Sequence, residues 1–218
     1  MTSSEENYLK TIYHLEALKA GSVMTSQIAD RMNTTSASVT DMIKKLSEKN
    51  LVDYERYHGV KMTRKGEKMA LGVIRRHRLW EVFLTDILKF NWDEVHVLAE
   101  ELEHVSSDEL ISRLDAYLGH PRFDPHGDPI PDGSGKMSHP AGQSLSEVET
   151  GQDVYLFGVS DHSPPFLRFL DKKGLKPGVR FVVLEKDEFD QSILIRFVGG
   201  ETTFLSHQAA QQLLIRHD

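Results

Sequence analysis

The sequence predicts a multi-domain protein that is mainly α-helical with a smaller share of β structure. Three observations support this fold class. Apolar residues recur at helical spacing through much of residues 5–118, a stretch rich in Pro, Gly, Asp and His follows at 120–142, and the remainder holds short apolar runs typical of strands. A chain of 218 residues is long enough for two or three small domains. We therefore expect three domains, at residues 1–74, 75–141 and 142–218.

The composition limits where the protein works and what it binds. The chain has no Cys, which excludes disulfides and thiolate ligands. It has no apolar leader and no run of about 18 apolar residues, so we expect a cytoplasmic protein that does not contact a membrane. The net charge of −7 conceals an asymmetry, because residues 1–78 carry 14 Lys and Arg against 9 Asp and Glu, or +5, which leaves −12 for the rest. A basic N-terminal third is typical of a nucleic-acid-binding module.

The first third of the chain has the element order of a winged helix-turn-helix. Helices are expected at residues 5–19, from an N-cap at Thr25, and from Thr35 or Ser36. The buried face of the third helix follows the i, i+3, i+4, i+7 spacing of Val39, Met42, Ile43 and Leu46. Two strands at 51–57 and 60–63, joined by a turn at His58-Gly59, would form the wing.

The third helix and the wing carry the residues that we expect to contact DNA. Small polar side chains at the start of the helix allow it to enter a major groove, and basic side chains further on neutralise phosphates. The residues expected near bases or the sugar-phosphate backbone are Thr35, Ser36, Ala37, Ser38 and Thr40, and those expected at phosphates are Lys44, Lys45, Arg56 and Lys61. Because the expected base-reading residues include no Arg, Asn or Gln, part of the specificity should come from methyl contacts and DNA shape. The alternative, a winged helix used for protein contacts, is disfavoured by the basic charge.

The middle of the chain combines large apolar residues with acidic and imidazole side chains. A fourth helix, capped by Thr63, has a basic first half and an apolar second half, which indicates a buried interface between helices or between subunits. Two more helices are expected, from Trp92 or Asp93 to about Val105 and from Asp108 to Leu118 after a cap at Ser106 or Ser107. We therefore expect an all-α dimerisation domain here.

The segment from His96 to His104 has the spacing of a metal site. If it is helical, Glu100, Glu103 and His104 share one face, and His96 lies four residues before Glu100 on that face. Two carboxylates and an imidazole that converge suit a divalent metal. Taken alone, the segment fits a solvated acidic helix better. Weaker pairs of the same kind are His77 with Glu81 and Asp124 with His126.

The last third of the chain has the pattern of a small, strongly bent β-barrel. Short strands are expected at 154–157, 179–184 and 193–198, with short helices at 164–173 and 206–214. Glycines punctuate these runs. The chain contains no Gly-rich phosphate loop and no hydrolase motif, so we expect neither an enzyme nor a small-molecule substrate.

Several stretches, taken together, resemble the diphtheria-toxin-repressor and manganese-transport-regulator family of metal-dependent repressors. The stretches are Glu6 to Tyr13, Ala37 to Thr40, Arg76 to Leu79, Glu100 to His104, Ser107 to Glu109 and Pro125 to Pro131. The C-terminal part resembles the SH3-like (FeoA-like) domain that some members carry. The resemblance implies a transcriptional repressor that binds double-stranded operator DNA as a homodimer when a divalent metal is present.

The resemblance also implies two sets of metal ligands. The main regulatory site would use Asn7, Glu100, Glu103 and His104. A second site would use His77 or Glu81, or both, with Asp124, His126 and Asp161, and His96 matches a second-site ligand of iron-type members. This chain lacks the sulfur ligands of iron-type members and has Lys10 where some manganese-type members have Glu. An oxygen-rich set favours Mn²⁺, with Fe²⁺ as the alternative and Zn²⁺ or Co²⁺ as substitutes in vitro.

The expected switch is a clamp between the first helix and the dimerisation domain. Without metal, the facing carboxylates should repel one another and the first helix should drift, whereas a bound cation would fix both parts. Two other functions remain open. One is a winged-helix regulator that senses an organic ligand, and the other is a metalloenzyme that uses Glu100 or Glu103 as a general base.

Overall fold

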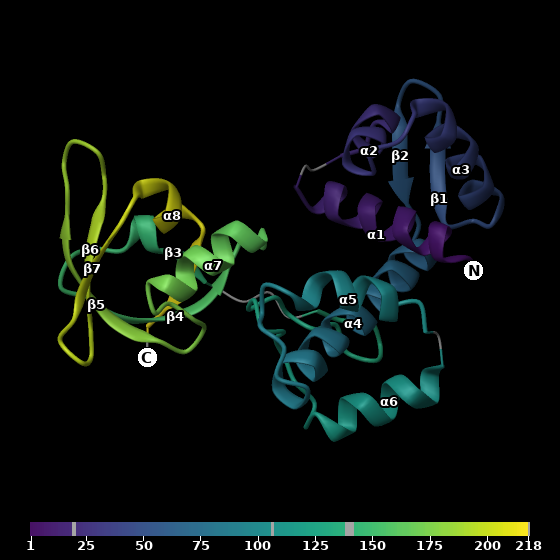
Figure 1. The fold of residues 1–218 in the computed structure, drawn as a ribbon. Coiled ribbons are helices and arrows are strands. Elements are labelled where there is room, and N and C mark those ends of the chain that lie inside the picture. The colour runs from purple at the N-terminus through teal and green to yellow at the C-terminus, as the bar shows by residue number, and fades with distance from the viewer. Residues whose placement is uncertain (19–20, 106, 138–141, 218) are drawn as a thin grey trace. The chain divides into compact units, whose positions relative to one another are not determined.

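The computed structural model describes residues 1–18, 21–105, 107–137 and 142–217 (Figure 1). The predictions for Lys19 and Ser106, and the predicted domain boundary at 141, lie outside these residues. The chain forms two compact units. The N-terminal unit contains Met1–His77, Glu100–Ile111 and Pro131–Met137, and the C-terminal unit contains Arg78–Ala99, Ser112–Ile130 and Ser138–Asp218.

The N-terminal unit begins with the predicted winged helix-turn-helix. Its elements are α1 (Ser3–Leu18), α2 (Thr25–Arg31), α3 (Ser36–Glu48), β1 (Val52–Glu55), β2 (Gly59–Met62) and the start of α4 (Arg64–Val82). The two strands pair antiparallel and form the wing. The core that unites α1, α2 and α3 consists of fully buried apolar side chains, among them Leu9, Ile12, Ile28, Val39, Ile43 and Leu46. Burial of these side chains is the main force that holds the three helices together.

Side-chain caps set the beginnings of the helices in this unit. Thr35 caps α3, since its Oγ1 accepts a hydrogen bond from the Ser38 amide at 3.2 Å. Thr63 caps α4 in the same way, with the Gly66 amide at 3.1 Å. The cap at Thr63 was predicted, and α3 was predicted to begin at Thr35 or Ser36. The prediction of Thr25 as a cap is wrong, because Thr25 is already helical and the side-chain oxygen of Gln27 accepts the Met24 amide at 3.0 Å.

The helical middle departs from the prediction in two places. After α4 the chain makes one π-helical turn (Phe83–Ile87), in which the Thr85 hydroxyl donates to the Glu81 carbonyl oxygen at 3.0 Å and the Leu88 amide donates to Phe83. The next helix, α5 (Val95–Leu102), is shorter than predicted at both ends and is followed by α6 (Asp108–Tyr117). Glu103 and His104 therefore lie in the turn after α5 and not on a helical face.

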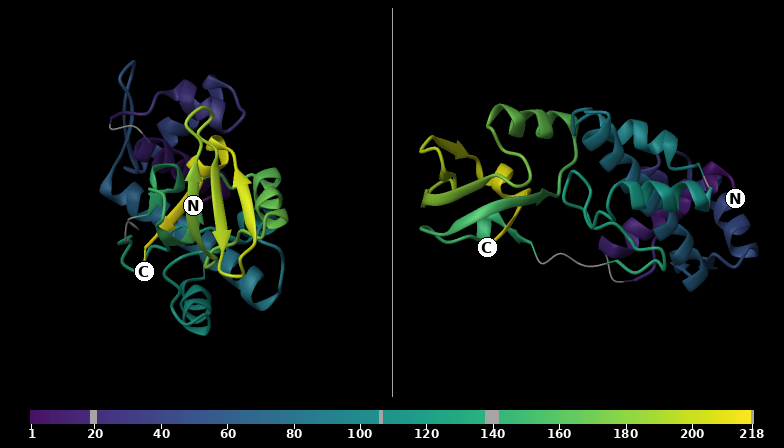
Figure 2. Two further views of the ribbon diagram at one scale, coloured as in Figure 1. Left: turned by 90° about the vertical axis from the view of Figure 1, so that its left-hand side faces the viewer. Right: turned by 90° about the horizontal axis from the view of Figure 1, so that it is seen from below.

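The remainder of the C-terminal unit is a six-stranded antiparallel sheet, drawn in green to yellow in Figure 2. The strands are β3 (Gln143–Ser144), β4 (Asp153–Val159), β5 (Arg180–Lys186), β6 (Ile193–Phe197), β7 (Thr202–Leu205) and β8 (Leu213–Arg216), in the spatial order β3-β8-β4-β5-β6-β7. Two helices, α7 (Pro164–Lys172) and α8 (His207–Gln211), accompany them. Side chains such as Leu156, Leu167, Phe181 and Ile195 build a separate apolar core.

The last strand replaces the end of a predicted helix. The prediction extended a helix from 206 to 214, but α8 ends at Gln211 and Leu213–Arg216 pair with β4. Along β8, Leu213 and Ile215 are buried while Leu214 and Arg216 are half-buried, which is the alternation of a strand. Among the described residues, none of the helices has the length and apolar character needed to cross a membrane.

Two glycines of α4 form a matched pair for a stability test. A Cβ at Gly66 would lie 2.0 Å from the Leu51 carbonyl oxygen, whereas a Cβ at Gly72 would meet only the Arg76 guanidinium at 3.9 Å. We expect Gly66→Ala to lower the free energy of unfolding by about 2 kcal/mol or more, because backbone must move. Gly72→Ala should be neutral or stabilising by up to about 1 kcal/mol. Urea titration of both variants measures this, and equal losses would contradict the close packing of α4 against Leu51, between α3 and β1.

Candidate metal centres and nucleic-acid interface

The start of α3 presents a small polar surface. Thr35, Ser36, Ala37 and Ser38 are exposed, and Thr40 is half-buried with its hydroxyl donating to the Ser36 carbonyl oxygen at 2.8 Å. The predicted phosphate contacts Lys44, Lys45, Arg56 and Lys61 are all exposed. The opposite side of α3 is buried in the core, so the exposed side chains of this helix are the ones that remain available to a nucleic acid.

The tip of the wing is a positively charged and aromatic turn. Arg56 stacks over the ring of Tyr57 at 4.9 Å from its centroid, and Tyr57 is 78% exposed. Lys61 follows on β2. An exposed guanidinium held by a ring suits a phosphate contact beside the groove that α3 would enter.

Glu6 on α1 is a buried carboxylate with two cationic or imidazole partners. One oxygen lies 2.9 Å from the Arg76 guanidinium and the other 2.6 Å from His104 Nδ1. Arg76 also donates to the backbone carbonyl oxygen of Glu103. Sequence analysis missed Glu6 as part of the site, although its spacing of three residues from the inward Leu9 would have placed it on the buried face. Glu6 therefore joins α1 to α4 and to the turn after α5.

Glu103 is the second buried carboxylate of this region, and both of its oxygens have partners. The Lys10 ammonium lies 2.6 and 2.8 Å from the two oxygens, and His77 Nδ1 lies 2.6 Å from one of them. Burial raises the pKa of Glu103, but the hydrogen bond from His77 and the charge of Lys10 outweigh this and lower it. His77, expected in the second site, thus contacts a residue of the first.

The residues expected at the main regulatory site fit a hard divalent ion, although Glu103 and His104 are paired with other groups. Asn7 Oδ1 is buried and has no hydrogen-bond partner among the described residues, so one oxygen ligand is unused. Glu100, Glu103 and His104 do not gather into a ligand cluster in the described part of the chain. The reason is that Glu103 is held by Lys10 and His77, while His104 is held by Glu6. Two carboxylates, an amide oxygen and one imidazole remain a donor set suited to Mn²⁺ or Fe²⁺.

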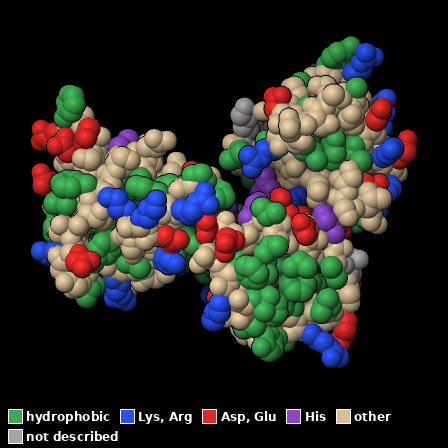
Figure 3. All heavy atoms as spheres, in the orientation of Figure 1, with side chains coloured by type: hydrophobic (Ala, Val, Ile, Leu, Met, Phe, Trp, Pro, Cys, Tyr) green, Lys and Arg blue, Asp and Glu red, His purple; other side chains and the backbone are tan. Residues whose placement is uncertain are grey.

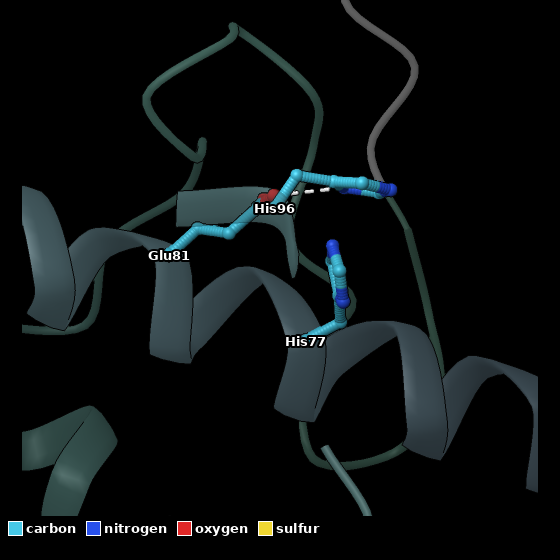
Figure 4. A group of neighbouring side chains, drawn as sticks. All are labelled: His77, Glu81 and His96. Atoms are coloured by element: carbon cyan, nitrogen blue, oxygen red, sulfur yellow. Dashed lines mark hydrogen bonds and ion pairs between the residues drawn. The ribbon is translucent and has the colours of Figure 1, made fainter. Parts of the chain in front are cut away.

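A second group of potential ligands lies along α4 and α5. Figure 4 shows His77 and Glu81 one turn apart on α4, with His96 beside Glu81 at 3.3 Å. Because α4 runs through His77 without a break, the helix itself fixes His77 relative to Glu81. The potential ligand atoms of all three lie within 4.8 Å of one another. His96 thus lies beside Glu81 and also one turn before Glu100 on α5.

Glu81 also belongs to a fully buried cluster with Asp124 and His126, whose potential ligand atoms lie within 4.8 Å of one another. His126 Nε2 donates to the Trp92 carbonyl oxygen at 2.8 Å, which turns Nδ1 toward Glu81 at 3.8 Å. Nδ1 is buried and has no hydrogen-bond partner among the described residues. A histidine that donates one ring nitrogen to a backbone carbonyl and directs the other toward carboxylates has the usual arrangement of a metal ligand. This cluster fits a divalent ion.

Charge in this cluster is balanced by protons. Burial raises the pKa of Asp124 to about 8, and the neighbouring Glu81 and Asp128 carboxylates add to the effect. Burial lowers the pKa of His126, but its contact with Glu81 outweighs this and raises the pKa to about 9. At neutral pH the cluster therefore holds protons at positions where a metal ion would bind.

The segment that carries Asp124 and His126 is attached to β4. The Val159 amide donates to the His126 carbonyl oxygen at 2.9 Å, and a Cβ at Gly158 would lie 2.6 Å from that oxygen. The ring of His126 stacks between Trp92, at 5.9 Å, and His162, at 4.8 Å between centroids. Only a glycine at 158 permits this approach, so β4 helps to position the segment that carries Asp124 and His126.

Asp161 does not join Glu81, Asp124 and His126 in the structure. It is half-buried, and its Oδ1 accepts a hydrogen bond from the Ser163 amide at 2.8 Å. Its neighbour His162 contacts His126 instead, a role that sequence analysis did not assign. The only local signal was the position of His162 next to Asp161.

Three family models match successive parts of the chain. They are the N-terminal DNA-binding domain of iron-dependent repressors at residues 1–60, the metal-binding and dimerisation domain of iron-dependent repressors at 63–132, and the FeoA domain at 143–217. Together they match most of the chain between residues 1 and 217.

Similar proteins match the chain over most of its length. The diphtheria toxin repressor of Corynebacterium diphtheriae is 31% identical over 198 residues, which are 88% of this chain and 79% of the repressor. A manganese-dependent transcriptional repressor, solved in complex with manganese, is 37% identical with a TM-score of 0.86 and covers 97% of this chain and 98% of its own. The manganese regulator SloR is 33% identical with a TM-score of 0.73, and the match covers 100% of both chains.

Metal uptake by the Glu81–Asp124–His126 cluster should release protons. Below the pKa values of about 8 for Asp124 and about 9 for His126, a proton occupies each ligand, so the affinity should fall as the pH falls. Calorimetry with Mn²⁺ in two buffers of different ionisation enthalpy counts the protons. The variant His126→Ala should release fewer protons than the parent protein. Uptake at this cluster without proton release at neutral pH would contradict the assignment.

Proposed function

This chain belongs to the family of iron-dependent repressors and is a metal-dependent transcriptional repressor, and from that premise we propose that Mn²⁺ is the metal it senses. We further propose that the metal-loaded homodimer binds operator DNA. The observation that carries the choice of metal is the donor set around Glu103. This donor set contains carboxylates, an amide oxygen and one imidazole but no sulfur. The chain has no Cys, and positions 7 and 100 hold Asn and Glu and not Met.

Hard oxygen ligands favour Mn²⁺ over softer ions, with Fe²⁺ next. Zn²⁺ and Co²⁺ would bind in vitro, since affinity for most sites rises along the divalent series from Mn²⁺ to Cu²⁺. The two similar solved repressors named for manganese support the same choice. Their names describe those proteins, and the oxygen-rich ligands of this chain are the independent argument.

The chain's own residues link the metal site to the reading helix through a short path. Asn7 lies on α1, and the adjoining Leu9 and Ile12 are fully buried against the core of α2 and α3. Glu103 and His104 lie in the turn after α5 and contact α1 through Lys10 and Glu6. When bound, the metal supplies positive charge to these carboxylates. The position of α1, and with it that of α3, then depends on which partner those carboxylates hold.

An exposed apolar surface supports the homodimer. In the C-terminal unit, Ile87, Leu88, Phe90 and Tyr117 are 41, 53, 42 and 68% exposed. Figure 3 shows hydrophobic side chains gathered over the helical region that contains α6. A second copy of the chain would cover these side chains and place two α3 helices on successive turns of DNA, roughly 34 Å apart.

Removing one ligand should raise the Mn²⁺ concentration needed for DNA binding. We expect Asn7→Leu, which replaces the unpaired amide oxygen by an apolar group of similar size, to raise the half-activating concentration about tenfold or more. The matched control is Glu101→Gln, an exposed acid beside the site. Fluorescence anisotropy with DNA selected from genomic fragments measures both. If chelation leaves DNA binding intact, or if both variants respond alike, the proposal fails.

Phosphate contacts should show in the salt dependence of DNA binding. Replacing a lysine that contacts a phosphate reduces the slope of log K against log salt by about one. We expect this for Lys44→Gln and Lys61→Gln with little change in sequence preference. Lys176→Gln, an exposed lysine of the C-terminal unit, serves as the control. Equal slopes for all three variants would remove α3 and the wing from the interface.

A further inference from the structure

Lys10 places a positive charge on the buried carboxylate that the proposed metal site needs. Its ammonium lies 2.6 and 2.8 Å from the two oxygens of Glu103 and 3.8 Å from Glu100. We propose that Lys10 is a tethered cation that occupies the site in the metal-free protein and that must leave Glu103 before a divalent ion binds. This inference rests on the proposed function, since it assumes that Glu103 is a metal ligand.

The burial of the pair makes the contact stronger than a surface salt bridge. The side chain of Glu103 is fully buried and that of Lys10 is only 15% exposed. A buried carboxylate without a partner is costly. Both oxygens of Glu103 accept from the Lys10 ammonium and one also contacts the His77 ring, so neither oxygen lacks a partner. The metal-free site is therefore a complete structure in itself, with its own cation.

This arrangement changes what the metal-free state looks like. Lys10 and Glu103 are 93 residues apart in sequence, and their contact joins α1 to the turn after α5. Glu6 adds a second connection between the same parts through His104. The expectation that facing carboxylates repel and release α1 is thus corrected, because Lys10 neutralises them. Metal binding exchanges one cation for another instead of ending a repulsion.

The exchange makes Lys10 the residue that sets the threshold of the sensor. A divalent ion at Glu103 must displace the ammonium, which lowers the apparent affinity of the ion. Removing the charge while keeping the length of the side chain should therefore act in two opposite directions. The metal-free protein should become less stable, and Mn²⁺ should bind more tightly.

The test compares Lys10→Met with Lys49→Met in the full-length protein. Lys49 forms a similar short contact, at 2.6 Å, with Glu5. Glu5 lies on α1, as Lys10 does, and is not among the proposed ligands. Thermal unfolding in a chelator and calorimetry with Mn²⁺ are measured for each. We expect both variants to lower Tm, and only Lys10→Met to raise the Mn²⁺ affinity, by about tenfold or more. A lower Tm for Lys10→Met with unchanged or weaker Mn²⁺ binding would overturn the proposal.

A second measurement uses the parent protein, so it does not depend on folding of a variant. Mass spectrometry after acetylation reports how accessible each lysine is. We expect Lys10 to be protected without metal and to react faster once Mn²⁺ is bound, while the exposed Lys44 is unchanged. Equal or slower labelling of Lys10 with Mn²⁺ bound would overturn the inference. A parent protein that takes up no Mn²⁺ would instead overturn the proposed function.

Discussion

The contact between Glu103 and its two partners, Lys10 and His77, is the interaction on which the arrangement of the N-terminal unit depends. It fixes the turn after α5 against α1 on one side and α4 on the other. Because the carboxylate is fully buried, it cannot exchange these partners for water, and its position is decided by whichever positive or donating group reaches it. The apolar core that α1 shares with α2 and α3 extends this constraint to the DNA-reading surface. A change of partner at Glu103 can therefore reach α3 through packed side chains.

In both candidate metal centres, positive charge neutralises the carboxylates when no metal is bound. At Glu103 the charge is an ammonium from the same chain. At Glu81, Asp124 and His126 it is protons: burial and neighbouring carboxylates raise the pKa of Asp124 to about 8, while contact with Glu81 outweighs the effect of burial and raises the pKa of His126 to about 9. Metal binding in such sites is an exchange of cations, and its free energy is a difference between two filled states.

Local patterns predicted the winged helix-turn-helix with its wing, the start of α3 and the cap at Thr63, because periodicity and capping depend on residues close in sequence. Local patterns could not predict the end of α5 at Leu102, which moves Glu103 and His104 off the helix. They also missed that Leu213–Arg216 is a strand, since its partner β4 lies far away in the sequence. Lys10 was identified only as standing where some manganese-type members have Glu, and its contact with a residue 93 positions away was not visible in any spacing. The residue types of the sites could therefore be predicted from the sequence, but the residues that they contact could not.

The most direct test is anomalous diffraction at the manganese absorption edge from crystals of the full-length protein grown with Mn²⁺. The account predicts a peak within bonding distance of Asn7, Glu103 and His104, with the Lys10 ammonium no longer in contact with Glu103. A structure that contains Mn²⁺ only elsewhere, with both oxygens of Glu103 still on Lys10, would contradict it.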